Sequence, residues 1–433
     1  MPRPGPTPAP RDVLRATFDA ALAAVDPAVV LEGRLPAPPP GRLAVVALGK
    51  GALGMLDVAL RAYEADGVPL AAVAVVPPGG AEPRAGVTVV EGDHPVPGAG
   101  SARAADAVAD LATPLGPDDA LLVLVSGGGS SLVAAPADGT DLAPEGLADV
   151  VDALLRAGAD VADVNAVRRC LGRLAGGRLA RLAHPARVHT RIVSDVVGDD
   201  PALIASGPTV ARDGDPARAL AALAGAGVDR PDVVRALRGM EAGSVPGPAA
   251  VGTVPNATPP EVVASGRHAL AAAARALAAR GLATEMVGEV TGDAREAGRA
   301  AAHDVAARLA RGEGPLVLLA GGEVTVHVRG GGRGGPSSTF AVAFARALPP
   351  EAPVVALVAD SDGVDGVGGH AGAFVEPGGL ADLPDAQVAA WDAADDTLAA
   401  CEAAGAVFAP GPTGVNVNDL RFVWLDPTGR FDA

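Results

Sequence analysis

Apolar segments of strand length alternate along the chain with segments of helical periodicity. In the first half, the pattern predicts strands at residues 42–48, 70–76, 120–125 and 188–195. Between and around them it predicts helices at residues 11–25, 52–65, 101–113, 145–158 and 164–182. This alternation is typical of α/β proteins with parallel sheets, and continuous apolar strands such as LLVLV indicate burial on both faces.

The second half repeats the alternation after a segment rich in Gly and Pro. Residues 211–260 predict a helical connector with loops. Beyond it, the pattern predicts helices at 261–280, 293–312, 339–347 and 386–404, and strands at 283–288, 315–320, 323–329, 353–359 and 421–426. At 433 residues the chain is long enough for two domains. We expect two α/β/α sandwich domains, at residues 1–250, including the connector, and 251–433.

Composition and charge exclude several classes of protein. The formal net charge of −17 argues against nucleic-acid binding through a general basic surface. Two cysteines provide neither a disulfide framework nor a Cys-rich zinc module. We find no apolar leader at the N-terminus and no 18-residue apolar run, and so expect a soluble cytoplasmic protein that acts on a small molecule without a membrane partner. A homodimer is compatible with the sequence.

One lysine stands out because the other 33 basic side chains among the 34 are arginines. Lys50 lies in the sequence Gly49–Gly54, between a predicted strand and a predicted helix, and this segment fits the pattern G-x-G-x-x-G. A dinucleotide site would need an acidic residue after the second strand, where the sequence is VVPPGG. A structural tight turn is the other alternative. The lysine favours a phosphate or carboxylate site that needs a compact ammonium group.

Two further clusters in the first half could bind an anion. The glycines and serines that follow the LLVLV strand can surround a phosphate with backbone N–H and hydroxyl groups, although no Walker lysine follows. They are Ser126, Gly127, Gly128, Gly129, Ser130 and Ser131. Asn165 and Arg168 lie three residues apart on one predicted helix face and could clamp a carboxylate or phosphate.

Acidic groups at strand ends complete the set of candidates. Asp195 ends a strand of the first half, and Asp362 follows a strand of the second, where bases or magnesium ligands commonly lie. Asp362 belongs to a D-x-D-G fragment, but the rest of a calcium-binding EF-hand loop is absent. The same half has a Gly-rich basic loop with Arg333, and the polar positions Glu323, Thr413, Asn416 and Asn418. Together these features favour a nucleotide–metal site.

These blocks, in this order, resemble the glycerate 2-kinase family, whose members have an N-terminal DUF4147 region and a C-terminal MOFRL region. The matching segments are Gly49–Lys50, Gly92–Pro97, Ser126–Ser130, Asn165–Leu179, Ser194–Thr209, Gly321–Glu323, Ser361–Gly366 and Gly411–Asp419. The resemblance implies a Rossmann-like first domain and an active site in the cleft between the two domains. It also implies phosphorylation of the 2-hydroxyl of D-glycerate by ATP with Mg²⁺.

The resemblance places the catalytic lysine of the family at Lys50 and its two aspartates at Asp195 and Asp362. It implies that either aspartate is the base and that the other helps to hold the metal. Glu323, Thr413, Asn416 and Asn418 are then expected to bind the nucleotide. The serine and glycine cluster, with Asn165, Arg168 and Arg333, is expected to bind substrate or phosphate.

Two departures from the family pattern concern the acceptor. Ala175 stands where the family has a lysine. Gly334–Thr339 stands where the family has the run G-G-R-N-Q-E, and the arginine of that run is absent here. Either Arg329 or Arg333 replaces the missing arginine, or Ser337 and Ser338 bind the extra hydroxyls of a longer acid. A kinase of a C4 sugar acid is therefore an alternative to a glycerate kinase. An NAD(P)H-dependent hydroxypyruvate reductase and a sugar-acid binding protein are alternatives of other classes.

Overall fold

The computed structural model describes residues 9–94, 96–143, 145–159, 161–211, 215–247, 254–349 and 351–431. The chain divides into two compact units. The inserted unit is Val30–Val263, and the discontinuous unit combines Met1–Val29 with Ala264–Ala433. This division differs from the expected one at residue 250, because the first 29 residues group with the C-terminal part of the chain.

The inserted unit contains a six-stranded sheet in the order β3-β2-β1-β4-β5-β6. Its strands are β1 (Leu43–Leu48), β2 (Leu70–Val76), β3 (Val87–Glu91), β4 (Ala120–Val125), β5 (Arg187–Val193) and β6 (Glu261–Ala264). The pairings from β3 to β5 are parallel, and every residue of β1 and β4 is buried. This strand order is that of a Rossmann sheet, in which ligands bind where the order reverses, here between β1 and β4.

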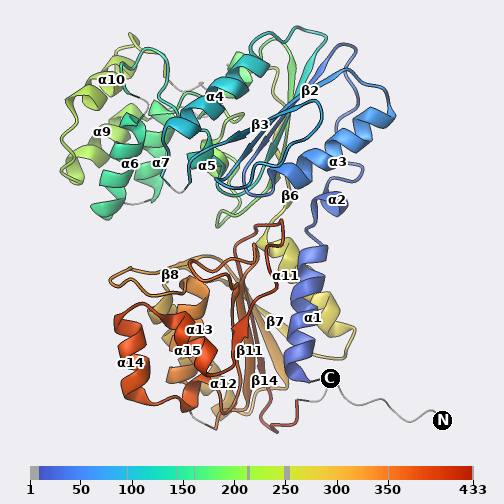
Figure 1. Ribbon diagram of the computed structural model, residues 1–433, viewed down its shortest axis with the longest axis vertical. Coiled ribbons are helices and arrows are strands. Elements are labelled where there is room, and N and C mark those ends of the chain that lie inside the picture. The colour runs from blue at the N-terminus through green and yellow to red at the C-terminus, as the bar shows by residue number, and fades with distance from the viewer. Residues whose placement is uncertain are drawn as a thin grey trace. The chain divides into compact units, whose positions relative to one another are not determined.

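Helices flank this sheet on both faces (Figure 1). The helical elements of this unit are α3 (Ala52–Ala65), α4 (Ala99–Ala112), α5 (Gly129–Leu132), α6 (Gly146–Arg156), α7 (Val161–Leu171), α8 (Arg178–Leu182), η1 (Ile204–Ser206), α9 (Pro216–Gly225) and α10 (Pro231–Glu241). The short α2 (Pro27–Val30) spans the chain boundary between the two units. A separate apolar cluster joins α6, α7, α9 and α10. The helix predicted at 164–182 is two helices, because Gly176 and Gly177 have positive φ angles of 60° and 78°.

The discontinuous unit has a mixed sheet in the order β13-β12-β11-β14-β9-β7. The strands are β7 (Thr284–Glu289), β9 (Leu316–Gly321), β11 (Val354–Asp360), β12 (Gly372–Val375), β13 (Val407–Phe408) and β14 (Asp419–Leu425), and a two-stranded ladder pairs β8 (Gly292–Asp293) with β10 (Val324–Thr325). β14 is antiparallel to both β9 and β11, so the parallel pattern does not extend through this sheet. The predicted strand 323–329 is reduced to β10.

Helices α12 (Ala294–Ala310) and α13 (Pro336–Ala347) cover one face of this sheet, and α1 (Pro10–Ala23) and α11 (Gly266–Ala278) cover the other (Figure 1). Phe18 of α1 packs edge-on against Phe408, with ring centroids 5.1 Å apart, which explains why the first residues belong to this unit. The helix predicted at 386–404 is α14 (Asp385–Ala393) and α15 (Thr397–Ala403). The break falls at Asp395, whose φ is 55°, and Asp396 caps α15.

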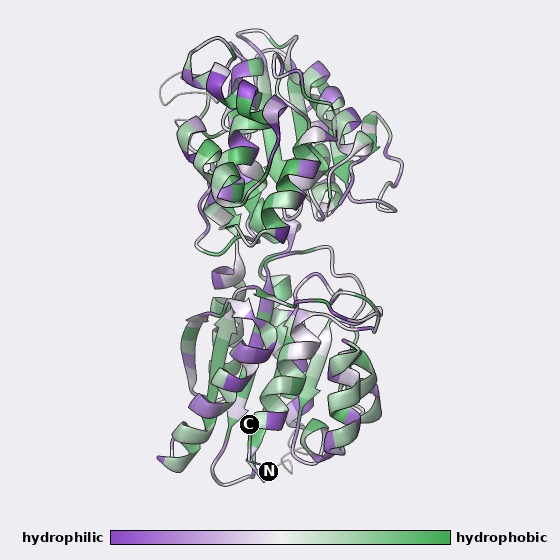
Figure 2. Cartoon of the chain, turned by 90° about the vertical axis from the view of Figure 1, so that its left-hand side faces the viewer, coloured by the Kyte–Doolittle hydropathy of each residue, from purple (hydrophilic) through white to green (hydrophobic). Residues whose placement is uncertain are grey.

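Apolar residues concentrate in the strands of both sheets (Figure 2).

A short 3₁₀ turn, η2 (Leu380–Asp382), precedes α14. Within the part of the chain that the structure describes, no helix is both long and apolar enough to cross a membrane.

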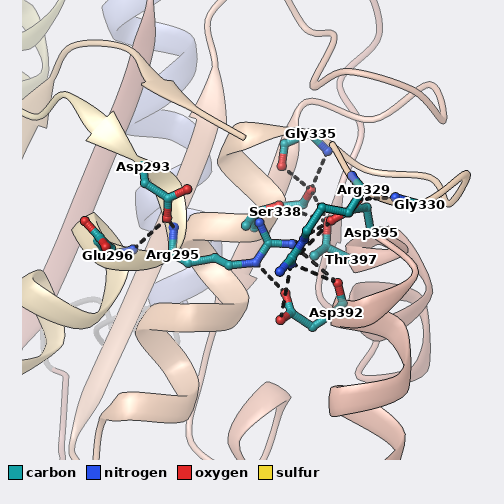
Figure 3. A network of polar contacts seen from close by, with 11 residues as sticks. Asp293, Arg295, Glu296, Arg329, Gly330, Gly335, Ser338, Asp392, Asp395 and Thr397 are labelled. Carbon is teal, nitrogen blue, oxygen red and sulfur yellow. Dashed lines mark hydrogen bonds and ion pairs between the residues drawn. The ribbon is translucent and has the colours of Figure 1, made fainter. Parts of the chain in front are cut away.

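A network of charged groups anchors the Gly-rich loop 329–335 to the turn between α14 and α15 (Figure 3). The carboxylate of Asp395 accepts hydrogen bonds from the backbone N–H groups of Arg329 and Gly330, and pairs with Arg295 at 2.8 Å. Arg295 also pairs with Asp392 at 2.6 Å. The backbone N–H groups and the nearby arginine lower the pKa of Asp395 from 3.8 to about 2. The loop is therefore held by an ionised carboxylate.

Asp395→Asn should lower the free energy of unfolding by about 1–2 kcal/mol at pH 7, because a buried anionic acceptor of two N–H groups is lost. Because the pKa of Asp395 is lowered in the folded state, its contribution is present above the ordinary pKa of 3.8 and is lost as the pH falls toward 2. Urea unfolding of both proteins should therefore give a difference that shrinks between pH 5 and about pH 2.

Asp392→Asn is the matched control, because this carboxylate pairs with the same arginine but its side chain is 43% exposed. Its cost should stay below about 1 kcal/mol. Equal losses for the two variants, or a pH-independent difference for Asp395→Asn, would contradict the proposed anchoring.

Candidate active site

Two turns at the carboxyl ends of β1 and β4 are fastened together by one buried hydroxyl. Ser126 Oγ accepts a hydrogen bond from the N–H of Gly51 at 2.9 Å and donates to the carbonyl of Leu48 at 3.1 Å. The N–H of Lys50 donates to the carbonyl of Gly127 at 2.9 Å. The Ser126 hydroxyl, which the sequence placed among the anion ligands, therefore joins the two turns that carry the other candidates.

The glycines of these turns permit the close approach. A Cβ at Gly49, whose φ is 114°, would lie 2.4 Å from Ser126 Oγ. A Cβ at Gly128, whose φ is 86°, would lie 3.2 Å from the ring of His94 and 3.8 Å from Cγ of Lys50. A Cβ at Gly129 would lie 2.9 Å from that of Ala205. Larger residues would push the turns apart.

Lys50 is exposed at the end of β1, immediately before the turn that leads into α3. Its side chain passes Gly128 on the side where His94 also lies. His94 was not among the predicted site residues. It follows β3, which the sequence pattern did not predict, and recognising that strand would have placed a histidine at the same sheet edge. Asp93 positions this segment, because its carboxylate accepts from the N–H of Ser101 at 2.9 Å.

The structure brings together three of the predicted anion-binding groups around a small pocket. Arg168 of α7, the serines Ser130 and Ser131, and Ser206 of η1 line a cavity of about 20 Å³. This volume holds about one water-sized group. Burial lowers the pKa of the Arg168 guanidinium, and within the described parts of the chain this group has no hydrogen-bond or ion-pair partner. A desolvated, unpaired guanidinium beside hydroxyl groups is suited to a carboxylate or phosphate.

The remaining candidates of the inserted unit lie nearby in the fold. Asn165, one turn before Arg168 on α7, is only 7% exposed and does not line the small pocket. Asp195 is half-buried in the turn that follows β5, at the same sheet edge as Lys50. The Ser206 hydroxyl donates to Ser130 Oγ at 3.3 Å, which links η1 to the glycine-rich turn.

The discontinuous unit gathers its candidates at one edge of its own sheet. β9 and β11 end, and β14 begins, at this edge, because β14 runs antiparallel to both. The candidates placed there are Glu323, Asp362, Thr413, Asn416 and Asn418. Glu323 is exposed, and Asp362 is half-buried.

Two loops interlock at this edge. A Cβ at Gly363 would lie 2.1 Å from the carbonyl oxygen of Gly411, so only glycine fits there. Thr413 Oγ donates to the carbonyl of Ser361 at 2.6 Å, and Ser361 Oγ accepts from the N–H of Val417 at 2.8 Å. The Thr413 hydroxyl thus holds the loop geometry, and the loops present Asp362 and the two asparagines from a rigid frame.

The amino terminus of α13 is closed by a carboxylate of the chain itself. Asp365 accepts from the N–H groups of Ser337 and Ser338 at 2.8 and 2.7 Å. Both serines are 0% exposed, and their hydroxyls bond Asp419 and Thr397. Neither serine is available to bind the extra hydroxyls of a longer substrate in this structure.

Arg333 forms a two-point ion pair with Glu402 of α15, at 3.0 and 2.7 Å. Arg329 lies near Asp392 and Asp395 (Figure 3). Exposed ion pairs of this kind contribute about 0–1 kcal/mol, so Arg333 could exchange Glu402 for a substrate at little cost. Its role in place of the missing arginine stays a prediction.

No cluster of three or more His, Cys, Asp or Glu side chains forms a metal cage among the described residues. Mg²⁺ is commonly held by one or two carboxylates together with the phosphates of its substrate. Single strand-end carboxylates such as Asp195 and Asp362 fit that mode of binding.

Comparison with known proteins agrees with this architecture. Residues 13–238 match the model of a domain of unknown function, DUF4147, and residues 316–419 match that of the MOFRL family. A protein of Agrobacterium vitis provisionally named hydroxypyruvate reductase is 39% identical over 430 residues, covering 96% of this chain and 94% of the relative. The D-glycerate 2-kinase of Thermotoga maritima is 32% identical over 389 residues, covering 88% and 89%.

The fold has a close counterpart among solved structures. The crystal structure of glycerate kinase from Thermotoga maritima superposes with a TM-score of 0.82 at 29% identity, covering 96% of this chain and 99% of that one. Two matching regions in the expected order, long relatives above 30% identity and this shared fold together establish the family. The chain belongs to the glycerate 2-kinase family of DUF4147–MOFRL proteins.

Proposed function

We propose that this protein transfers the γ-phosphoryl group of ATP to the 2-hydroxyl of D-glycerate and releases 2-phosphoglycerate. One observation carries the proposal: the turn with Lys50 is fastened to the Gly- and Ser-rich turn at the point where the strand order of a Rossmann sheet reverses. Ligands of open α/β sheets bind at that position. The relatives named as glycerate kinases support the choice of reaction and acceptor.

Positioning and charge neutralisation provide most of the catalysis in phosphoryl transfer. Lys50 neutralises charge on the transferring group, since it is a cation at the end of β1 beside the glycine-rich turn. Arg168 binds the acceptor carboxylate, with Ser130 and Ser131 as hydrogen-bond donors. The cavity of about 20 Å³ has room only for a group the size of a water molecule, such as one carboxylate oxygen of the acceptor.

Asp195 or Asp362 orients the acceptor hydroxyl and takes its proton, and the other carboxylate helps to hold Mg²⁺. When bound, Mg²⁺ would neutralise charge on the phosphates. Glu323, Asn416 and Asn418 lie at the sheet edge of the discontinuous unit, where the nucleotide is proposed to bind. That both sheet edges serve one interdomain site stays a prediction.

A hydroxypyruvate reductase is the main alternative, because relatives carry that name. β2 ends at Val76 and Pro77–Gly80 follow, so the strand end lacks the acidic residue that a dinucleotide ribose requires. The first carboxylate of this loop, Glu82, pairs with Arg84 at 3.1 Å. Gly54, the third glycine of the pattern, is exposed and does not provide the close helix–strand packing of that fingerprint. These two observations favour the kinase. A kinase of a C4 sugar acid remains the alternative within the same chemistry.

With ATP, Mg²⁺ and D-glycerate, the product should be the 2-phosphate. Enolase consumes 2-phosphoglycerate directly, whereas the 3-phosphate needs a mutase first, so coupled assays with and without mutase separate the two. A signal that requires mutase would contradict the regiochemistry. A panel of C3 and C4 hydroxy acids in the same assay identifies the acceptor, and NADH oxidation with hydroxypyruvate would support the reductase instead.

Lys50→Ala should lower kcat by roughly 10²–10³-fold, equivalent to about 3–4 kcal/mol, because a cation aimed at the transferring group is lost. Lys50→Arg should restore little of it, since the planar guanidinium differs in shape from an ammonium group. Arg61→Ala, on the exposed face of α3, is the control and should leave kcat unchanged. Near-normal turnover of Lys50→Arg would show that any cation suffices.

Arg168→Ala should raise KM for the acceptor by roughly 10–100-fold, corresponding to about 1.5–3 kcal/mol for a hydrogen bond to a charged group. The KM for ATP should change little. Arg156→Ala is the control, because that side chain is 81% exposed at the end of α6. Equal increases in both KM values would place Arg168 outside the acceptor site.

A further inference from the structure

The discontinuous unit contains a large pocket that none of the proposed catalytic groups occupies. It lies between α12 and the β7–β9–β14 part of the sheet, and its volume is about 470 Å³. Its walls include Ala297 and Ala301 of α12, Val287 of β7, Leu318 of β9 and Phe340 of α13. Pockets of this size with mostly apolar walls are suited to small organic ligands.

Arg421 of β14 lines this pocket and is itself only 1% exposed. Its terminal nitrogens bond the carbonyls of Gly321 and Gly322 and the carboxylate of Asp419. Its guanidinium lies over the ring of Phe340, 4.9 Å from the centroid. Its Nε is buried without an acceptor among the described residues. This nitrogen has no accessible surface, so the contribution of Arg421 to the pocket is a flat, charge-paired wall together with Phe340.

The charges of the pocket exclude a phosphate as its occupant. Glu289 and Asp304 are both wall residues, and the positive charge of Arg421 is already paired with Asp419. The pocket therefore suits an uncharged planar ring that packs on the apolar walls and donates from an amino group to Glu289 or Asp304. Adenine has both the ring and the amino group.

The pocket adjoins a residue that the sequence placed at the nucleotide site. The N–H of Val290, a wall residue, donates to the carbonyl of Gly321 at 2.8 Å. A Cβ at Gly322 would lie 2.4 Å from the carbonyl oxygen of Val290. Glu323 follows directly, and β8 pairs with β10 beside it. The apolar pocket and the candidate nucleotide residues thus share one edge of the sheet.

We propose that this pocket holds the adenine base of the phosphoryl donor, an inference that rests on the proposed kinase function. The base packs between α12 and β7, with Phe340 and Arg421 at its inner wall. The phosphates extend toward the loops of Asp362 and Asn416, where the Mg²⁺ of the proposed reaction would offset the negative charge. The pocket accordingly selects the purine, and the loops at the sheet edge bind the charged part of the nucleotide.

Ala301→Phe and Val287→Phe, made in the full chain, fill the pocket from opposite walls. Val287 is 48% exposed on an edge strand, so this variant tests the pocket even if Ala301→Phe fails to fold. Each should raise KM for ATP by about tenfold or more, with kcat and the KM for glycerate within about twofold of wild type. Adenosine binding by calorimetry should be lost, whereas tripolyphosphate binding should not change.

Ala389→Phe is the matched control, because Ala389 lines a separate groove of about 410 Å³ in the same unit. It should leave the KM for ATP unchanged. If folded pocket variants keep the KM for ATP and bind adenosine as wild type does, the base site is wrong and the kinase function stands. If wild type phosphorylates no acid but the pocket variants lose adenosine, the base site stands and the proposed reaction fails. Equal loss of adenosine and tripolyphosphate also overturns the assignment of the pocket to the base.

Discussion

The buried hydroxyl of Ser126 is the contact on which the candidate site of the inserted unit depends. It bonds the backbone on both sides of Lys50, because it accepts from Gly51 and donates to Leu48. This arrangement joins the turn after β1 to the turn after β4, the two strands between which the sheet order reverses. It acts together with two backbone hydrogen bonds between the same turns, from the N–H of Ser126 to Leu48 and from the N–H of Lys50 to Gly127. The Ser126 hydroxyl, which the sequence predicted to bind substrate, forms two internal hydrogen bonds that hold the turns in place.

Buried carboxylates hold neighbouring segments together in the discontinuous unit. Asp365 closes the amino terminus of α13, and Asp419 receives the Ser337 hydroxyl and the Arg421 guanidinium. Burial raises the pKa of Asp419, and the adjacent arginine opposes that shift. Removing one partner of such a buried pair is costly because the other charge remains uncompensated. The two buried carboxylates therefore fix the helix and strand that border the candidate nucleotide pocket.

The sequence predicted the parts of the fold that have strong local signals. The runs LAVVAL and ALLVLV became fully buried strands, and the helix at 52–65 has the expected bounds. β3 was missed because its residues are half-buried or exposed and its apolar pattern is weak, and His94 was missed with it. The helices predicted at 164–182 and 386–404 are each divided into two shorter helices in the structure. The breaks depend on positive φ angles at Gly177 and Asp395. Periodicity alone does not report such angles.

In the candidate site too, features that depend on neighbouring residues were predicted, and contacts between distant parts of the chain were not. Polar residues at strand ends were identifiable because carboxyl ends of parallel strands share an edge. The pairing of Arg333 with Glu402 joins residues 69 apart in sequence, and the capture of the α13 amino terminus by Asp365 joins segments 27 and 28 apart. Spacing along the chain carries no signal for either. Ser337 and Ser338 replace polar residues of the family pattern, and the sequence suggested that they bind substrate. Their burial shows instead that their hydroxyls bond within the protein.

The position of α1 has a consequence for how the protein is made on the ribosome. Phe18 packs against Phe408, so its partner emerges 390 residues after it. At translation rates of about 5–20 residues per second, this delay is roughly 20–80 seconds. The inserted unit can fold during that interval, whereas Phe18 of α1 lacks its aromatic partner. The part of α1 around Phe18 therefore stays exposed in the nascent chain until β13 has been synthesised.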